Sequence, residues 1–590
     1  MKVLNIKSIF ILSILILSNS CYDLDRFPLD KANSATFWQT DEQAKMGILG
    51  AYTKLKGWDE SKKLHAYGYG MLFANDCMSD IGMGYDEPGY YRMQTGVYSA
   101  YTTELVSKWQ SCYDGVQAAN IVIRNVQNSK TISENVKNQI VGEAKFLRSL
   151  FYFHLMDHWG GVPIYDESTN IDDDFNRLLK PRNSIEETRA FIIKDLTDAI
   201  ELLPLSWPAD NYGRATKGAA YAMRGKVYLF AEDYEHAYKD FEEIVLKKST
   251  YRYGLYADYA KLFLPKENGG GDESNEIIFA IQNGGGWGKR YGIPTMFYMG
   301  SRSAYKWSWN CSMPSKSLVD MYEMKDGKKF NWNEHIPGFN ESQDVRNRTY
   351  LATLSTNKSK VTAYPEHLDS LLNMYEQRDP RMRQTIILPY DHYTGWASAN
   401  VPEKDYEFVV AQGTLETNGF MRSNYPSVYH FFWRKLVGEG DLKGLITDRD
   451  HSPINFPIIR YADVLLMLAE CYNELGRYDE AVTYINEVRK RPSTNMPALN
   501  SGPVWLEART KEEIFKRIMH ERAVELAGEG LRFSDIKRWR LGEELLNRDE
   551  LQITGEKAYT RVFTSRDYLW PIPAAEIDMN PQLKPNNPGW

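Results

Sequence analysis

The sequence predicts a mainly α-helical protein, built on a scaffold of about four helical hairpins that carries a large, irregular, loop-rich insertion with few short strands. Two observations lead to this fold class. Apolar residues recur at helical spacing toward both ends of the chain, and this pattern largely stops between residues 252 and 456. We therefore predict a signal peptide at 1–20, an N-terminal helical region at 21–251, the loop-rich subdomain at 252–456 and a C-terminal helical region at 457–590.

The first twenty residues have the character of an export signal. Lys2 and Lys7 precede an apolar stretch at residues 9–17, which is too short to span a bilayer. The sequence SNSC at 18–21 resembles a lipobox, although Leu17 lies one place further from the cysteine than is usual. We therefore expect Cys21 to be lipidated and the mature chain to be anchored to a membrane without spanning it.

The clearest helical hairpin lies at residues 458–491. Apolar residues follow a helical period up to Leu475, and Gly476 ends this helix in the manner of a left-handed cap. A second helix follows, with the small residue Ala481 at the crossing. Two antiparallel helices joined by a tight turn resemble a tetratricopeptide (TPR) unit, which has about 34 residues.

Further copies of this hairpin precede it. Residues 218–247 have apolar and small residues at similar offsets, and two looser pairs combine 136–158 with 185–203 and 42–56 with 107–127. Because one helix pair cannot bury its own apolar face, the pairs are expected to stack on one another. The alternative is a set of unrelated helical hairpins.

Several classes of function are disfavoured. The net charge of −7 is unsuited to nucleic acid, which needs a basic patch. Widely spaced cysteines without a CxxC pair argue against zinc, and a HExxH motif begun by His520 fails at Val524. We therefore predict no enzyme, no cofactor and no metal, although paired carboxylates of a glycoside hydrolase stay open. The pairing of these cysteines is also open: Cys77, Cys112, Cys311 and Cys471.

Several motifs in order resemble the SusD/RagB family. The most specific are HERAVELAGEGLRFSDIKRW at 520–539 and LWPIPAAEIDMNPQLKPNNPG at 569–589, and RDPRMRQTI at 378–386 agrees with them. The resemblance implies a surface lipoprotein with TPR-like helices that captures a glycan for a SusC-like TonB-dependent transporter. The charges of 520–539 are themselves expected to form ion pairs that fix the last helices, and the terminal prolines predict an extended path.

Two segments combine the groups that bind sugars, which are aromatic rings for the apolar face and polar side chains for the hydroxyls. They lie at 67–92 and 282–309, and Trp396 is a third candidate. The alternative is that these aromatics fill the core of the subdomain. The candidate ligand-binding residues are Asn75, Asp80, Tyr85, Tyr90, Arg92, Trp287, Arg290, Tyr291, Trp307, Trp309 and Trp396.

The predicted function is therefore non-enzymatic glycan binding at the cell surface. The rival hypothesis is a TPR-type adaptor that binds a protein or peptide in a concave helical groove, with the aromatic loops serving only the structure.

Overall fold

The computed structural model describes residues 37–56, 69–84, 90–169, 178–283, 292–305, 307–396, 402–423, 428–447 and 449–590. The predicted lipidation site and some predicted ligand contacts lie outside these residues: Cys21, Tyr85, Trp287, Arg290 and Tyr291.

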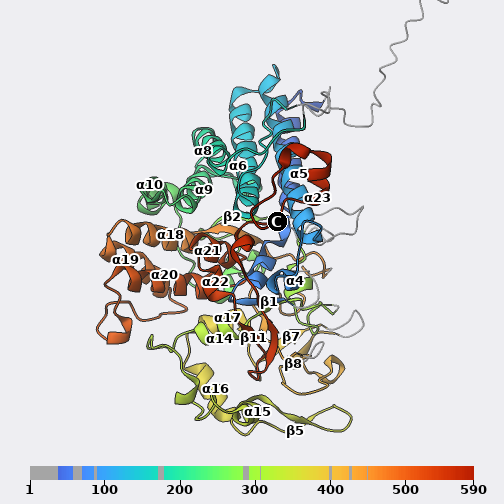
Figure 1. The fold of residues 1–590 in the computed structure, drawn as a ribbon, viewed down its shortest axis with the longest axis vertical. Helices are drawn as coiled ribbons and strands as arrows, with labels where there is room; N and C mark the ends of the chain where they lie inside the picture. Colours follow the sequence, from blue (N-terminus) through green and yellow to red (C-terminus); the bar gives the residue numbers. More distant parts are fainter. Residues whose placement is uncertain are drawn as a thin grey trace, which may run out of the picture.

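Stacked helices form the upper and left parts of the molecule in Figure 1. From α5 onward the long helices pack in chain order, each against the next, and α10 packs on α18, which also contacts α20. The mainly α-helical, TPR-like prediction is confirmed, but α5 packs chiefly on α6 rather than on α3. These helices are α3 (Asp41–Thr53), α5 (Thr103–Asn128), α6 (Glu134–Trp159), α8 (Ile185–Leu202), α9 (Lys217–Phe230), α10 (Tyr234–Leu246), α18 (Tyr461–Glu474), α19 (Tyr478–Arg489) and α20 (Lys511–Glu525).

Local sequence signals set the ends of these helices. Capping boxes begin three of them, at Thr40, Ser184 and Thr510, where the cap side chain and the third helical residue satisfy each other's backbone N–H. Gly476 has a φ of +75° beyond the end of α18. The predicted left-handed turn between α18 and α19 is therefore confirmed.

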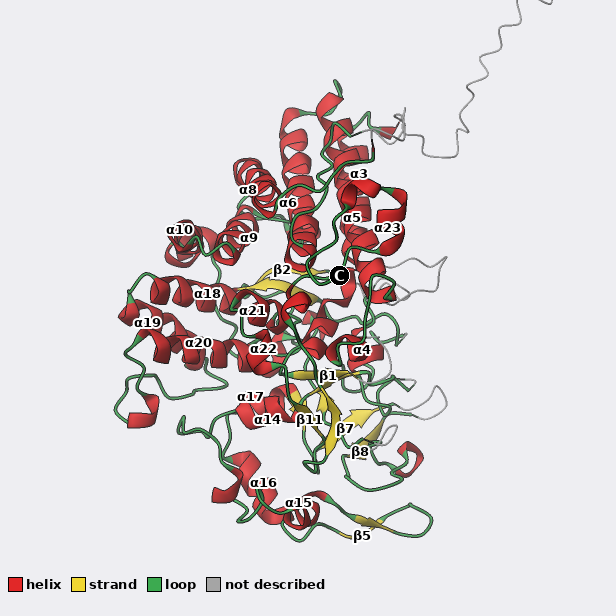
Figure 2. Cartoon of the chain, viewed as in Figure 1, coloured by secondary structure: helices red, strands yellow, loops and turns green. Residues whose placement is uncertain are grey.

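A strand pair closes the loop-rich insertion, because β2 (Ile277–Ile281) pairs antiparallel with β10 (Phe456–Arg460). The sheets among the described residues all have two strands. Figure 2 shows β2 between the helices of the main stack, whereas the other labelled strands of the insertion lie below it among short helices. The short elements are α13 (Thr295–Met299), β3 (Ser312–Pro314), α14 (Lys316–Met321), α15 (Gln343–Tyr350), β4 (Thr353–Leu354), β5 (Val361–Ala363), α16 (Leu368–Glu376), α17 (Arg381–Thr385), β6 (Ile386–Ile387), β7 (His392–Gly395), β8 (Lys404–Glu407) and β9 (Phe432–Trp433).

One hydrophobic core joins the insertion to the helices. Its buried members run from Trp38 to Leu583 and include residues of the insertion such as Tyr322 and Trp433. The described cysteines at 77, 112, 311 and 471 are buried, and burial raises the pKa of Cys77 and Cys112 to about 12. These two are therefore unreactive at neutral pH.

The charges of residues 520–539 form the predicted ion-pair network, which is buried. Glu525 contacts Arg381 at 3.0 Å, Arg460 at 2.8 Å and Arg491 at 2.6 Å. Glu521 pairs with Arg381 and Arg489. The network connects α20 with α17 of the insertion and with the end of α19, so it fixes the insertion on the helices.

The chain after α20 packs back over the scaffold through α21 (Arg532–Arg538), α22 (Gly542–Leu545), the hairpin of β11 (Asp549–Leu551) with β12 (Lys557–Thr560), and α23 (Ala574–Met579). The indole N–H of Trp159 at the end of α6 donates to the carbonyl of Pro571 at 2.9 Å. The predicted extended path is interrupted by α23, which begins directly after Pro573. Proline is well suited to the position before a helix, since its φ is already fixed there.

Candidate ligand-binding site

The two segments predicted to bind ligand lie side by side. β1 (Gly82–Gly84) pairs antiparallel with β3, which directly follows the second segment, so that Gly84 faces Ser312. The rings of Phe73 and Tyr298 also pack together, with centroids 6.4 Å apart. This pairing joins positions more than two hundred residues apart in the sequence.

Three predicted residues of the first segment are buried and unavailable to a ligand, which corrects their assignment. Asn75 accepts a hydrogen bond from Lys108 at 3.3 Å, and Tyr90 is also in the core. Asp80 is 2% exposed and receives two hydrogen bonds from Arg532, each 2.9 Å long. Burial alone would raise the pKa of Asp80, but Arg532 outweighs it and the pKa is lowered.

Arg92 is the exception in this segment. It lies in the last turn of α4 (Tyr90–Gln94) with its side chain exposed. It therefore stays a candidate contact.

The second segment carries exposed tryptophans. Trp307 is 51% exposed and Trp309 is 38% exposed, although large apolar side chains usually lie inside. Trp307 has a φ of +60°, which is rare for a bulky residue. Its carbonyl accepts a hydrogen bond from Arg449 at 2.7 Å, and its N–H donates to Ala304 at 3.1 Å. Both neighbours hold Trp307 in this unusual conformation.

A stack of rings supports Trp309. Its indole lies 4.9 Å from the ring of Phe297, and its backbone N–H donates to the carbonyl of Phe297 at 2.7 Å. The guanidinium of Arg449 lies 4.8 Å from the same ring, within the range of a cation–π interaction. Sequence reasoning missed Phe297 and Arg449, since no local pattern connects position 449 with position 309.

Trp396 belongs to the same part of the insertion. It follows β7, is partly buried, and donates its backbone N–H to the carbonyl of Ser303 at 2.7 Å. Its ring meets the ring of Tyr305 nearly at a right angle, 4.9 Å away. The structure therefore attaches Trp396 to residues 303–305, directly before the exposed pair Trp307 and Trp309.

One group of side chains has the residue types of a metal site. Glu323, His520 and Glu521 place ligand atoms within 4.8 Å of one another. Glu323 and Glu521 are already paired with Arg489, and Glu323 also pairs with Arg517. Because these guanidinium charges already neutralise the carboxylates, we assign this group to the ion-pair network and not to a cation.

None of the described helices combines the length and the apolar character that crossing a bilayer requires.

Stacked helical hairpins joined to a loop-rich insertion, with exposed tryptophans on the insertion, define a TPR-like binding scaffold. The chain belongs to the SusD family, whose model matches residues 275–590. A second family model, described as starch-binding and associating with the outer membrane, matches residues 74–229.

Individual relatives agree with this assignment. The chain is 26% identical to a SusD-like protein of Formosa agariphila over 97% of both chains. It is 24% identical to the starch-binding protein SusD of Bacteroides thetaiotaomicron, over 55% of this chain and 60% of the other. A crystal structure of a SusD-like carbohydrate-binding protein from Bacteroides fragilis superposes with a TM-score of 0.74, at 23% identity, covering 93% of this chain and all of the other.

Proposed function

We propose that the protein binds an oligosaccharide or polysaccharide at the cell surface, without cleaving it, and passes it to a TonB-dependent transporter. The observation that carries this proposal is the exposure of Trp307 and Trp309 on one short turn of the insertion. Sugar rings present apolar C–H faces that pack on indoles, and this contact removes apolar surface of the large aromatic ring from water.

The surroundings of this pair favour a prepared surface. Arg449 and Phe297 hold the two tryptophans through a carbonyl contact and a ring stack, so little order must be gained on binding. Arg449 is itself partly exposed, so it offers charged donors for hydroxyl groups beside the rings. We include Trp396 at the edge of this surface and, outside the described residues, Trp287, Arg290, Tyr291 and Tyr85.

The delivery step of the proposal is supported by the family. Its members are expected to act beside a SusC-like transporter, and a relative is named as starch-binding. We propose that lipidation of Cys21 anchors the protein to the outer membrane. An anchored protein meets its partner at a high effective concentration, so each single contact with glycan or transporter can be weak.

Affinity gel electrophoresis of residues 22–590 in gels containing single polysaccharides, starch among them, tests the function. We expect one class of polymer to retard the protein, and the chain length of that polymer to stay unchanged after long incubation. Shortening of the polymer would show a hydrolase instead. Migration unaffected by every polymer would favour the rival adaptor function, in which a protein or peptide is the ligand.

A further inference from the structure

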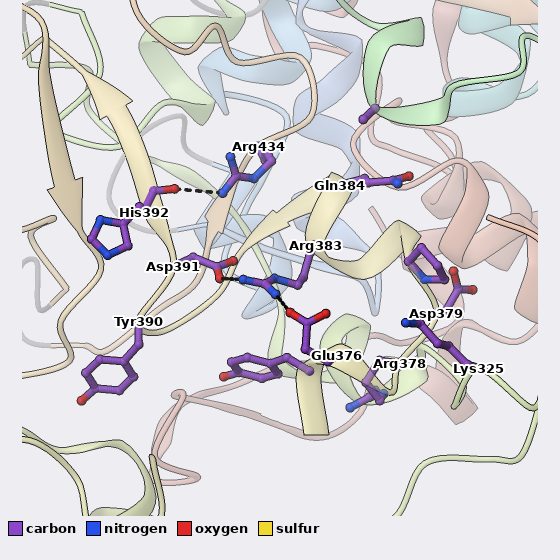
Figure 3. A pocket seen from close by; sticks show the side chains of 13 residues that line it. Lys325, Glu376, Arg378, Asp379, Arg383, Gln384, Tyr390, Asp391, His392 and Arg434 are labelled. Carbon is purple, nitrogen blue, oxygen red and sulfur yellow. Dashed lines mark hydrogen bonds and ion pairs between the residues drawn. The ribbon is translucent and has the colours of Figure 1, made fainter. Parts of the chain in front are cut away.

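A second hollow of the insertion lies away from the tryptophans and has a different lining. Figure 3 shows this pocket, which has a volume of about 560 Å³. That volume is within the range of about 300–1,000 Å³ that small-molecule sites occupy. Its walls come from α16, α17, the start of β7 and the residues that follow α14 and β9. The charged groups in the lining are Lys325, Arg378, Arg383, Arg434, Glu376, Asp379 and Asp391.

Two of the four cations have no carboxylate partner among the described residues. The guanidinium of Arg378 donates hydrogen bonds to the carbonyls of Val319 and Tyr322, both at 2.6 Å. Burial lowers the pKa of Arg378 to about 10, so it is still charged at neutral pH. Lys325 is exposed and makes no ion pair with a described side chain. Two positive charges of the pocket are therefore not paired with a described carboxylate, although the net charge of the protein is −7.

The carboxylates of the lining offset only part of this excess, since four cations face three carboxylates. Asp379 pairs with Arg381 at 2.7 Å, where both side chains are fully buried. Glu376 and Asp391 both pair with the single guanidinium of Arg383, as the dashed contacts in Figure 3 show.

Arg383, like the exposed Lys325, is a cation that a ligand can reach. Its side chain is 40% exposed and its partner Glu376 is 66% exposed. Exposed ion pairs stabilise a protein very little, so an incoming anion can replace Glu376 on Arg383 at small cost. Asp391 is buried and receives the other arm of the guanidinium, which keeps the remaining face directed at the pocket.

We propose that this pocket binds the carboxylate or sulfate group of an acidic sugar, held by Arg383 and Lys325. A planar guanidinium binds both groups through paired, charge-assisted hydrogen bonds. This inference rests on the proposed function, since it names acidic glycans as the substrate class. Strand β7 connects the pocket to the tryptophan surface, because His392 lines the pocket and Trp396 follows the last residue of the strand. At about 3.3 Å per residue the two positions are roughly 13 Å apart, so one polymer can reach both.

Single sugars test the pocket without requiring that the polymer be known. The dissociation constants of glucuronate, glucose 6-sulfate and glucose are measured by ligand-observed NMR with residues 22–590. We expect both acidic sugars to bind and glucose to bind at least tenfold more weakly. Binding of glucuronate alone, or of the sulfate ester alone, would define which anion the pocket takes. Equal binding of all three sugars, or of none, would overturn the inference.

A matched pair of variants locates the binding. Arg383→Gln is expected to weaken the acidic sugars about tenfold or more, the loss of a hydrogen bond to a charged group. Arg348→Gln is the control, because Arg348 on α15 is 42% exposed and also pairs with two carboxylates, Asp344 and Glu366. If Arg383→Gln does not fold, Lys325→Gln takes its place, since this exposed lysine contributes no ion pair to the fold. Acidic sugars that bind both variants like the wild type would contradict the assignment.

The test of this pocket and the test of the proposed function can give different results. A protein that binds neutral polymers but does not prefer acidic sugars loses only this inference. A protein that no polymer retards, but that binds glucuronate through Arg383, loses the proposed polysaccharide function while the pocket stands.

Discussion

At the scale of the residue, Trp307 shows how the fold keeps a large apolar ring in solvent. A bulky residue in the left-handed region costs on the order of 1–3 kcal/mol, which neighbouring contacts must offset. Here the backbone of Trp307 is fixed at both sides, by Ala304 at its N–H and by Arg449 at its carbonyl. Conformational strain that is kept beside an exposed aromatic side chain is typical of a functional surface.

Asp80 gives a prediction about the buried polar residues of the first segment. Asp80→Asn removes the negative charge that faces Arg532, and breaking a buried ion pair costs about 3–5 kcal/mol. We expect a lower unfolding midpoint in urea, measured by circular dichroism. The folded fraction is expected to bind ligand as the wild type does, because Asp80 does not reach the surface.

Asp114 is the control for this prediction. It is exposed and makes no ion pair with a described side chain, so Asp114→Asn is expected to change the free energy of unfolding by less than about 0.5 kcal/mol. Equal midpoints for the Asp80 and Asp114 variants would show that the buried pair does not stabilise the fold.

Sequence reasoning found the exposed tryptophans but not the arginines that we propose for ligand binding. In a segment rich in Gly, Tyr and Asp, a ligand contact and a buried ion pair have the same composition. The partner of Asp80 is 452 residues further along the chain, so no local signal distinguishes the two roles. Arg449 and Arg383 were missed for the same reason, since their roles depend on contacts that only the fold creates.

At the scale of the element, the turn between α18 and α19 can be tested with a pair of glycines. Gly476→Ala is expected to destabilise the protein by about 1–2 kcal/mol, because its φ is +75° although the space around it is open. Gly50 also has open space but lies inside α3, so Gly50→Ala is expected to stabilise by up to about 1 kcal/mol. Melting temperatures that shift in the same direction for both variants would contradict this account of the turn.

Helical periodicity predicted two of the hairpins well, since each of these pairs is encoded in one continuous stretch. The prediction at 218–247 corresponds to α9 and α10, and that at 458–491 to α18 and α19. The pairing of β2 with β10 was missed, because strands of five residues joined across such a distance carry no joint pattern. The helix α23 was missed because prolines at 571 and 573 suggested an extended chain, whereas Pro573 comes directly before the helix.

At the scale of the whole molecule, buried acids and histidines set the response to pH. Although burial opposes it, Arg381 and Arg489 lower the pKa of Glu521 from 4.5 to about 2. Its contribution to stability is therefore present above its unfolded pKa and is lost as the pH falls toward 2. Burial lowers the pKa of His158 to about 3, and its contribution is likewise lost as the pH falls below about 6.5.

Asp76 changes the stability with pH in the opposite direction to Glu521 and His158. Burial raises its pKa from 3.8 to about 7, despite hydrogen bonds from the N–H groups of Gly530 and Gly528. A carboxyl whose folded pKa is raised stabilises the fold when protonated, and this contribution is lost as the pH rises through 7. Asp76 therefore offsets part of the loss from histidine between pH 7 and 4.5, and below pH 4.5 the stability is expected to fall steeply.

Asp76→Asn isolates this contribution, because the amide resembles the protonated acid at every pH. We expect the variant to be more stable than the wild type at pH 8, by on the order of a few kcal/mol. The difference is expected to be smaller at pH 5 and to approach zero only below the unfolded pKa of 3.8. Urea midpoints at both pH values check this, and a difference that does not depend on pH would show that Asp76 ionises normally.

The central claim, that Trp307 and Trp309 form the glycan-binding surface, is tested most directly by calorimetric titration of the polymer found by affinity electrophoresis. The double variant Trp307→Ala/Trp309→Ala is compared with Trp505→Ala, whose indole is 41% exposed outside the insertion. We predict that the double variant loses about 10- to 100-fold in affinity and that Trp505→Ala binds as the wild type does. Unchanged affinity in the double variant, or an equal loss in both, would contradict the claim.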